Sequence, residues 1–150
     1  MATPRRLQQI VDMFAAASPQ LRLEELLEYS RRVPPLPGRL KGSMERVTEC
    51  QTPFFVAAEI DGGKVSLHFD APSEAPTTRG FAGVLAAGLD GATTDEVLGT
   101  PNDFYYEMGL AEAISVSRLQ GMSGILGRVK RQIREQLEKS RSAGDGLPAG

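Results

Sequence analysis

The chain has 150 residues, of which 41% are hydrophobic and 24% charged, and its formal net charge is −2. These values are typical of one globular domain, and the slight acidic excess gives no electrostatic basis for binding nucleic acid. No apolar stretch approaches the roughly 20 residues that cross a bilayer, and none of signal-peptide length follows the basic residues near the N-terminus. We therefore expect a cytoplasmic protein without a membrane span.

The first forty residues predict two helices and an extended loop. The first helix carries one apolar stripe at helical spacing, made of Leu7, Ile10, Val11 and Phe14. Ser18 supplies an N-cap and Pro19 a first-turn proline for a second helix, which runs to about Arg32. The proline-rich segment 34–37 then breaks the helical pattern and predicts an extended loop.

The middle of the chain predicts a small antiparallel sheet. Residues 54–60 form a strand-like apolar run, and residues 61–63 (Asp-Gly-Gly) form a tight turn. Residues 64–70 then alternate polar and apolar side chains, which is typical of a strand with one buried face. The segment 44–50 alternates only weakly and is a candidate edge strand.

Helices are predicted again in the second half of the chain. Four segments qualify: 78–89, a short helix with a capping box formed by Thr93 and Glu96, 102–108, and the amphipathic stretch 119–139. The cations of the last helix are interpreted as its solvated side: Arg128, Lys130, Arg131, Arg134 and Lys139. Residues 140–150 have little to bury, so we expect a disordered tail after a single domain at 1–139. The order of helices, sheet and helices predicts an α+β fold.

Cys50 is the only cysteine in the chain, so it cannot form an internal disulfide or, without partners, ligate zinc or an iron–sulfur cluster. A lone thiol can still attack, carry or donate a sulfur atom. Such chemistry requires an exposed thiol whose pKa lies below the free value of about 8.5, which Arg46 would favour and Glu49 would oppose. The alternative is a small buried hydrophobic residue. The local sequence leaves both interpretations open.

Other candidate residues have weaker patterns. His68 is the only histidine and lies on the polar side of its strand without a triad pattern, so we interpret it as a solvated residue. Gly80 and Gly83 lack the spacing of a phosphate-binding loop and are expected to pack helices together. Ser117 can cap the last helix, which would let Arg118 point into a cleft, where a guanidinium is a good partner for a thiolate. A plain surface arginine is the alternative.

Four segments match the motifs of one protein family in the same order. They are 32–37 at the end of the helical hairpin; Val47, Cys50 and Gln51, followed by Thr52 where the family has Ser and Phe55 where it has Trp; Ser73, Glu74 and Ala75 followed by Arg79 and Gly80; and Ser117, Arg118, Leu119, Gln120 and Gly121. Together they resemble the SufE family of sulfur acceptors, which serve cysteine desulfurases in iron–sulfur cluster assembly. The clearest departure is Glu49, where the family usually has glycine, the residue that best permits an unusual turn or a close approach.

The resemblance implies an α+β fold like that of the cluster scaffold IscU, with about three antiparallel strands and helices packed on one face. It implies that Cys50 receives sulfur as a persulfide. It also implies that four further residues line the sulfur site or contact the partner: Arg118, Glu74, Gln51 and Gln120.

The implied partners are a SufS-type cysteine desulfurase, which carries its own pyridoxal phosphate, and an iron–sulfur cluster scaffold complex downstream. The chain itself is expected to bind no cofactor, metal ion or nucleic acid, and to act as a sulfur carrier rather than as a stand-alone enzyme. The first alternative is an interaction module that activates a desulfurase without carrying sulfur, and a persulfide on Cys50 would distinguish the two. The second is an unrelated binding domain with a structural cysteine, which thiol labelling of the native protein would test.

Overall fold

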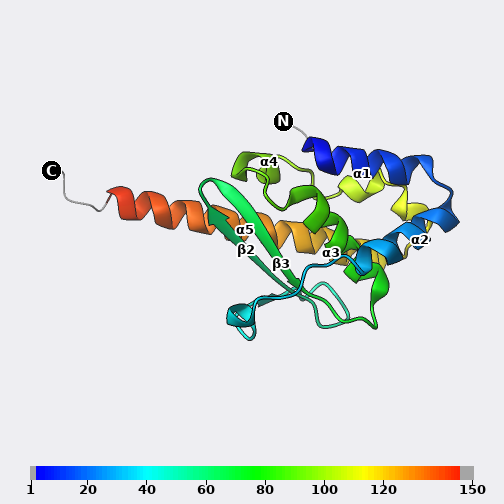
Figure 1. Ribbon diagram of the computed structural model, residues 1–150, viewed down its shortest axis with the longest axis horizontal. Coiled ribbons are helices and arrows are strands. Elements are labelled where there is room, and N and C mark those ends of the chain that lie inside the picture. The colour runs from blue at the N-terminus through cyan, green and yellow to red at the C-terminus, as the bar shows by residue number, and fades with distance from the viewer. Residues whose placement is uncertain (1–2, 146–150) are drawn as a thin grey trace.

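The computed structural model describes residues 3–145, and in this part of the chain helices flank a small sheet (Figure 1). In chain order the elements are α1 (Arg5–Ala16), α2 (Pro19–Ser30), η1 (Gly38–Leu40), β1 (Glu45–Arg46), β2 (Phe55–Asp61), β3 (Lys64–Asp70), α3 (Pro76–Leu89), α4 (Thr94–Leu98), η2 (Phe104–Tyr106), η3 (Leu110–Glu112) and α5 (Val116–Asp145). The sheet is antiparallel with the strand order β1-β2-β3. The predicted α+β class is therefore confirmed. No helix within residues 3–145 is both long and apolar enough to span a bilayer.

The first two helices form where the sequence predicts them, because their apolar residues share one face and their ends have suitable caps. α1 buries Leu7, Val11 and Phe14. The Ser18 hydroxyl accepts a hydrogen bond from the Leu21 amide (3.3 Å) and so caps α2. Both helices pack against α3, which lies between them and the sheet.

α3 approaches α2 closely because it carries glycines at the contact. A Cβ at Gly80 would clash with the backbone oxygen of Leu26, and one at Gly83 would clash with that of Tyr29. The prediction that these two glycines pack helices together is confirmed. This packing fixes the position of the first turn of α3, which borders the candidate site.

β2 and β3 form a hairpin whose turn needs glycine. Gly62 and Gly63 both have positive φ (59° and 77°), as a tight two-residue turn between strands requires. The face that is buried against the helices consists of Val56, Ala58, Val65, Leu67 and Phe69. The predicted alternation of β3 is thus present in its burial.

β1 contains only two residues, so the edge strand predicted at 44–50 is wrong beyond this pair. After β1 the Val47 amide donates a hydrogen bond to the Phe54 carbonyl oxygen (2.8 Å), and residues 48–53 leave the sheet between these two positions. Val47 and Phe54 are fully buried and hold the two ends of this excursion. We call residues 48–53 the Cys50 loop.

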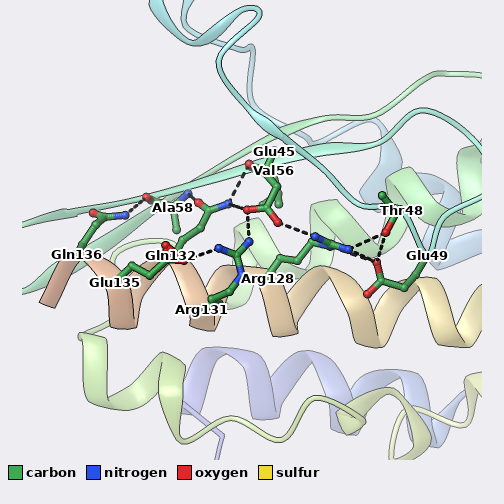
Figure 2. Close-up of polar contacts among 10 residues, drawn as sticks. All are labelled: Glu45, Thr48, Glu49, Val56, Ala58, Arg128, Arg131, Gln132, Glu135 and Gln136. Atoms are coloured by element: carbon green, nitrogen blue, oxygen red, sulfur yellow. Dashed lines mark hydrogen bonds and ion pairs between the residues drawn. The ribbon is translucent and has the colours of Figure 1, made fainter. Parts of the chain in front are cut away.

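α5 covers the part of the β2 edge that the short β1 leaves unpaired. The Ala58 amide donates to Oε1 of Gln132 (2.8 Å), and Nε2 of Gln136 donates to the Ala58 carbonyl oxygen (2.7 Å) (Figure 2). These bonds satisfy backbone groups that an open sheet edge would leave free. They also hold α5 lengthwise along the sheet, so that its N-terminal half lies beside the Cys50 loop.

α5 begins at Val116, earlier than predicted, because Ser115 rather than Ser117 is its N-cap. Ser115 Oγ accepts a hydrogen bond from the Arg118 amide (3.4 Å), and the Ser115 carbonyl oxygen accepts one from the Leu119 amide (3.1 Å). The Ser117 side chain is therefore not used as a cap and is available to the candidate site.

The C-terminal half of the chain differs from expectation in two further places. α5 continues to Asp145, because residues 140–143 contain neither Gly nor Pro to end it. The predicted tail at 140–150 is therefore helical in its first part, while residues 146–150 lie outside the described residues. The helix predicted at 102–108 is reduced to the short turn η2.

Candidate functional site

The Cys50 loop folds back onto α5. The Cys50 amide donates to the Val47 carbonyl oxygen (3.1 Å), which forms a tight turn at the start of the loop. Opposite the thiol, α5 has Gly121, where a Cβ would come within 3.1 Å of the Cys50 sulfur. The sulfur is thus packed against the helix backbone, and only 9% of the residue is exposed.

A pocket of about 190 Å³ opens beside the Cys50 thiol. Its lining comes from three segments: residues 50–52 of the Cys50 loop, residues 74–78 at the start of α3, and Ser117, Arg118 and Gly121 of α5. The first turns of two helices therefore border the same pocket, and helix N-termini carry partial positive charge. The lining adds the positive charge of the Arg118 guanidinium and the negative charge of the Glu74 carboxylate, so the pocket carries charges of both signs.

The polar side chains around the pocket are loosely held. Arg118 Nη1 donates to the Thr77 hydroxyl at 3.5 Å, and Gln51 Nε2 donates to Ser117 Oγ at 3.3 Å. Both hydrogen bonds are long and exposed, so these side chains can reorient toward a bound group at little cost. Within residues 3–145, no group of three or more His, Cys, Asp or Glu side chains is arranged to hold a metal ion.

The structure brings most of the predicted site residues together. Those that line the pocket are Cys50, Gln51, Glu74 and Arg118. Gln120 does not; it lines a shallow groove on another side of α5, together with Glu49 and Arg128. Positions two apart on a helix differ by about 200°, so Arg118 and Gln120 point in different directions. The roles of these residues stay predictions.

The interpretation of the α5 cations as one solvated side is wrong at two positions. Lys130 is buried, and this burial lowers the pKa of its ammonium group. Arg128 is largely buried, and its guanidinium binds Glu45, Thr48 and Glu49 (Figure 2). Charge patterning cannot identify such partners, because they are distant in sequence. The sequence feature that could have indicated such contacts is the recurrence of glycine at 121, 124 and 127, because glycines permit another segment to approach the helix closely.

Burial raises the pKa of the Cys50 thiol to about 11; the negative charge of Glu49 acts in the same direction, and Arg128 opposes it. This shift is opposite to the lowered pKa that sulfur chemistry at neutral pH requires. With such a pKa, roughly one thiol in a few thousand is ionised at pH 7.5. In this conformation Cys50 is therefore buried and almost entirely protonated at neutral pH.

We expect alkylation of Cys50 by iodoacetamide to accelerate by about tenfold for each pH unit from pH 8 to 10, because only the thiolate reacts. An unperturbed thiol would level off near pH 9. The raised pKa also means that the protonated thiol stabilises the folded state below about pH 8.5, and that this contribution is lost as the pH rises toward about 11. The rate of Cys50 alkylation at each pH is measured by quenching samples over time and determining their intact mass, with urea-unfolded protein as the control. A plateau near pH 9 in the native protein would contradict the expectation.

His68 lies on the sheet, outside the pocket beside Cys50. Its Nε2 is 3.0 Å from Glu59 Oε1, and Arg39 of η1 donates two hydrogen bonds to the same carboxylate (2.7 and 2.8 Å). The hydrogen bonds from Arg39 are the main reason that the pKa of the Glu59 carboxyl is lowered to about 2, and His68 acts in the same direction. The His68 side chain is only 19% exposed, so it is less solvated than predicted and helps attach η1 to the sheet.

If Cys50 accepts sulfur, as the family resemblance implies, His68→Gln should leave the rate near the parental value, because glutamine keeps a donor for Glu59 and the residue does not reach the pocket. Single-turnover transfer from a desulfurase measures this, with Arg39→Gln as a control for loss of the same carboxylate contact. A tenfold loss, about 1.4 kcal/mol in the barrier, confined to His68→Gln would place the residue in the site.

Comparisons with known proteins point to one family. A family model described as "SufE: Fe-S metabolism associated domain" matches residues 8–133. Uncharacterized SufE-like proteins from two Mycobacterium tuberculosis strains are each 49% identical over 134 residues, which cover 88% of this chain and 94% of theirs. The cysteine desulfuration protein SufE of Plasmodium vivax is 26% identical over 132 residues, covering 85% of this chain and 52% of its own length. The solution structure of a hypothetical protein from Thermus thermophilus matches with a TM-score of 0.83 and 44% identity, covering 91% of this chain and 98% of that one.

Proposed function

The chain belongs to the SufE family, as its sequence motifs predict, and on this basis we propose that it accepts sulfur on Cys50 from the persulfide of a cysteine desulfurase. We propose further that a SufS-type desulfurase is the donor and that the sulfur passes to an iron–sulfur cluster scaffold complex. The observation that carries the proposal is the position of the chain's only thiol beside a polar pocket that also contains Arg118. Because the reaction needs a reduced thiol, the reducing cytoplasm is the proposed compartment.

The proposed reaction is a displacement at sulfur, of the same kind as thiol–disulfide exchange. The Cys50 thiolate attacks the outer sulfur of the donor's persulfide, a new sulfur–sulfur bond forms at Cys50, and the bond to the donor's cysteine sulfur breaks. The leaving group is the donor's cysteine thiolate, which takes up a proton. One sulfur atom moves between two cysteines, and no external oxidant or reductant is needed.

The pocket supports this reaction by its charge. Arg118 and the first turns of α3 and α5, which carry positive charge, border the pocket beside Cys50 together with the Glu74 carboxylate. A guanidinium favours the thiolate of Cys50 over its thiol and stabilises the persulfide anion that is formed. The neutral, buried Cys50 of the closed loop becomes reactive when the loop presents it to this environment and to the donor.

The second candidate function is activation of a desulfurase without sulfur transfer. The observation that favours it is the burial of Cys50, whose pKa is raised to about 11, because such a thiol is a poor acceptor as it stands. Under this alternative the Cys50 loop and the pocket would serve as a docking surface, and no persulfide would form.

Intact-mass analysis after incubation with a cysteine desulfurase and free cysteine distinguishes the two functions. The expected result is a gain of one sulfur atom that a reducing agent removes. Protein whose Cys50 has been alkylated after unfolding and refolded is the control, and it should gain nothing. If the desulfurase is stimulated while the mass of the unmodified chain does not change, the activator function replaces sulfur acceptance.

A further inference from the structure

The Cys50 loop packs against α5 at two glycines. A Cβ at Gly121 would lie 3.1 Å from the Cys50 sulfur, and one at Gly124 would lie 2.7 Å from a carboxylate oxygen of Glu49. Residues three apart share one helix face, so these glycines make room for two consecutive residues of the loop. The space over Gly124 is occupied by the Glu49 carboxylate group itself.

Arg128, one turn beyond Gly124 on α5, contacts both the Cys50 loop and β1. Its Nη2 is 2.5 Å from Glu49 Oε1 and 2.8 Å from Thr48 Oγ1, while its Nη1 is 2.6 Å from Glu45 Oε2 (Figure 2). One guanidinium therefore joins the Cys50 loop to β1 and to the helix. Only 22% of the Arg128 side chain is exposed, so its ion pairs are partly shielded from solvent.

Apart from the packing of Cys50 itself, few other contacts hold the Cys50 loop on α5, whereas Glu45, the other acidic partner of Arg128, is firmly bound. Within residues 48–53, Cys50 is the one buried residue. Beyond the contacts with Arg128, the one other side-chain hydrogen bond from this loop to the rest of the described chain joins Gln51 and Ser117 (3.3 Å), and the Cys50 side chain packs into the core against Gly121. Glu45, which shares Arg128, is also bound by Arg131 and Gln132. The Glu49 contact is therefore the part of this cluster that can open alone.

We infer that Glu49 and Arg128 are positioning residues that latch the Cys50 loop onto α5 in the free protein and keep the Cys50 sulfur packed against Gly121. Breaking their ion pair frees the loop and exposes Cys50. The purpose of the latch, which is to withhold the thiol until a partner docks, rests on the proposed sulfur transfer. The latch itself is a property of the free chain and can be tested without a partner.

Alkylation of Cys50 by iodoacetamide in the free protein, at pH 8 and low salt, tests the latch. Glu49→Gln and Arg128→Gln remove opposite charges from the same contact. Both variants are expected to accelerate alkylation by about fivefold, which is the scale of one partly exposed ion pair. The double variant should match the faster single variant, because a latch can be opened only once.

An effect of charge without a latch predicts a different result. The charged groups around Cys50 are Glu49 in its own loop, Arg128 and Arg118 of α5, and Glu74 before α3. Losing Glu49 would then favour the thiolate and accelerate alkylation, whereas losing Arg128 would disfavour it and slow alkylation. Opposite changes, or parental rates in both variants, would overturn the inference.

Two glycine variants test the same latch without changing a charge. Gly124→Ala should displace the Glu49 carboxylate and accelerate alkylation about as much as Glu49→Gln does. Gly127→Ala is the matched control: it gives the same gain in helix propensity, but its Cβ would meet Asn102 Nδ2 at an ordinary 3.7 Å. Equal rates in the two variants would count against the latch. Thermal melts check that each variant is folded.

Salt dependence separates an ion-pair latch from a merely structural contact. Raising the salt concentration from about 50 to 500 mM weakens exposed ion pairs, so it should accelerate alkylation of the parent more than that of Glu49→Gln. Identical salt responses would overturn the role of the ion pair. None of these measurements involves a desulfurase. The latch can therefore be disproved while sulfur acceptance stands, and sulfur acceptance can be disproved while the latch stands.

Discussion

Cys50→Ser is expected to stop sulfur acceptance while leaving the fold intact. Serine has nearly the same size and fits against Gly121, but its hydroxyl stays protonated and is a far poorer nucleophile toward sulfur. We expect the transfer rate to fall by at least about a thousandfold, which corresponds to roughly 4 kcal/mol in the barrier. Persulfide transfer to the chain and the turnover of the desulfurase are measured in the same reaction, and a thermal melt verifies folding.

The serine variant also decides between the two proposed functions. A sulfur acceptor loses both persulfide formation and stimulation of desulfurase turnover, because the donor's persulfide can no longer be discharged onto this chain. An activator keeps its stimulation, since docking depends on the surface around Cys50 and serine changes little of it. If Cys50→Ser stimulates turnover as well as the parent does, sulfur acceptance is not the function.

Most of the fold could be predicted, because it depends on interactions between residues close in sequence. Ser18 caps α2 as expected, and the Thr93 hydroxyl and Glu96 carboxylate form the predicted capping box at α4. The start of α5 could not be fixed in this way, because Ser115 and Ser117 are both suitable caps.

The site was less predictable, because its properties arise where distant segments meet. The family resemblance assigns Cys50 and Arg118 to one site, and no spacing rule connects them. Gln120 shares a motif with Arg118 but faces a different groove. The burial of Cys50 depends on its docking against α5, and the ion pair with Arg128 gives Glu49 a partner that the motif alone does not indicate.

Arg118 is expected to act through the geometry of its charge. Its planar guanidinium borders the pocket beside Cys50, where it can stabilise the thiolate and the persulfide anion, while lysine supplies the charge without the fork of donors. Arg118→Ala should therefore slow sulfur transfer by about tenfold to a hundredfold, or roughly 1.4 to 2.7 kcal/mol. Arg118→Lys should restore part of this loss.

Single-turnover kinetics and thermal melts on both variants test the role of Arg118, with Arg134→Ala as the control for loss of another exposed arginine on α5. The hydrogen bond from Arg118 to Thr77 is long (3.5 Å) and exposed, so removing the side chain should hardly change the melt. Parental kinetics in Arg118→Ala would remove the residue from the site, and slow transfer with a collapsed melt would make it structural. Full recovery in Arg118→Lys would show that positive charge suffices, because lysine cannot reproduce the planar donor geometry.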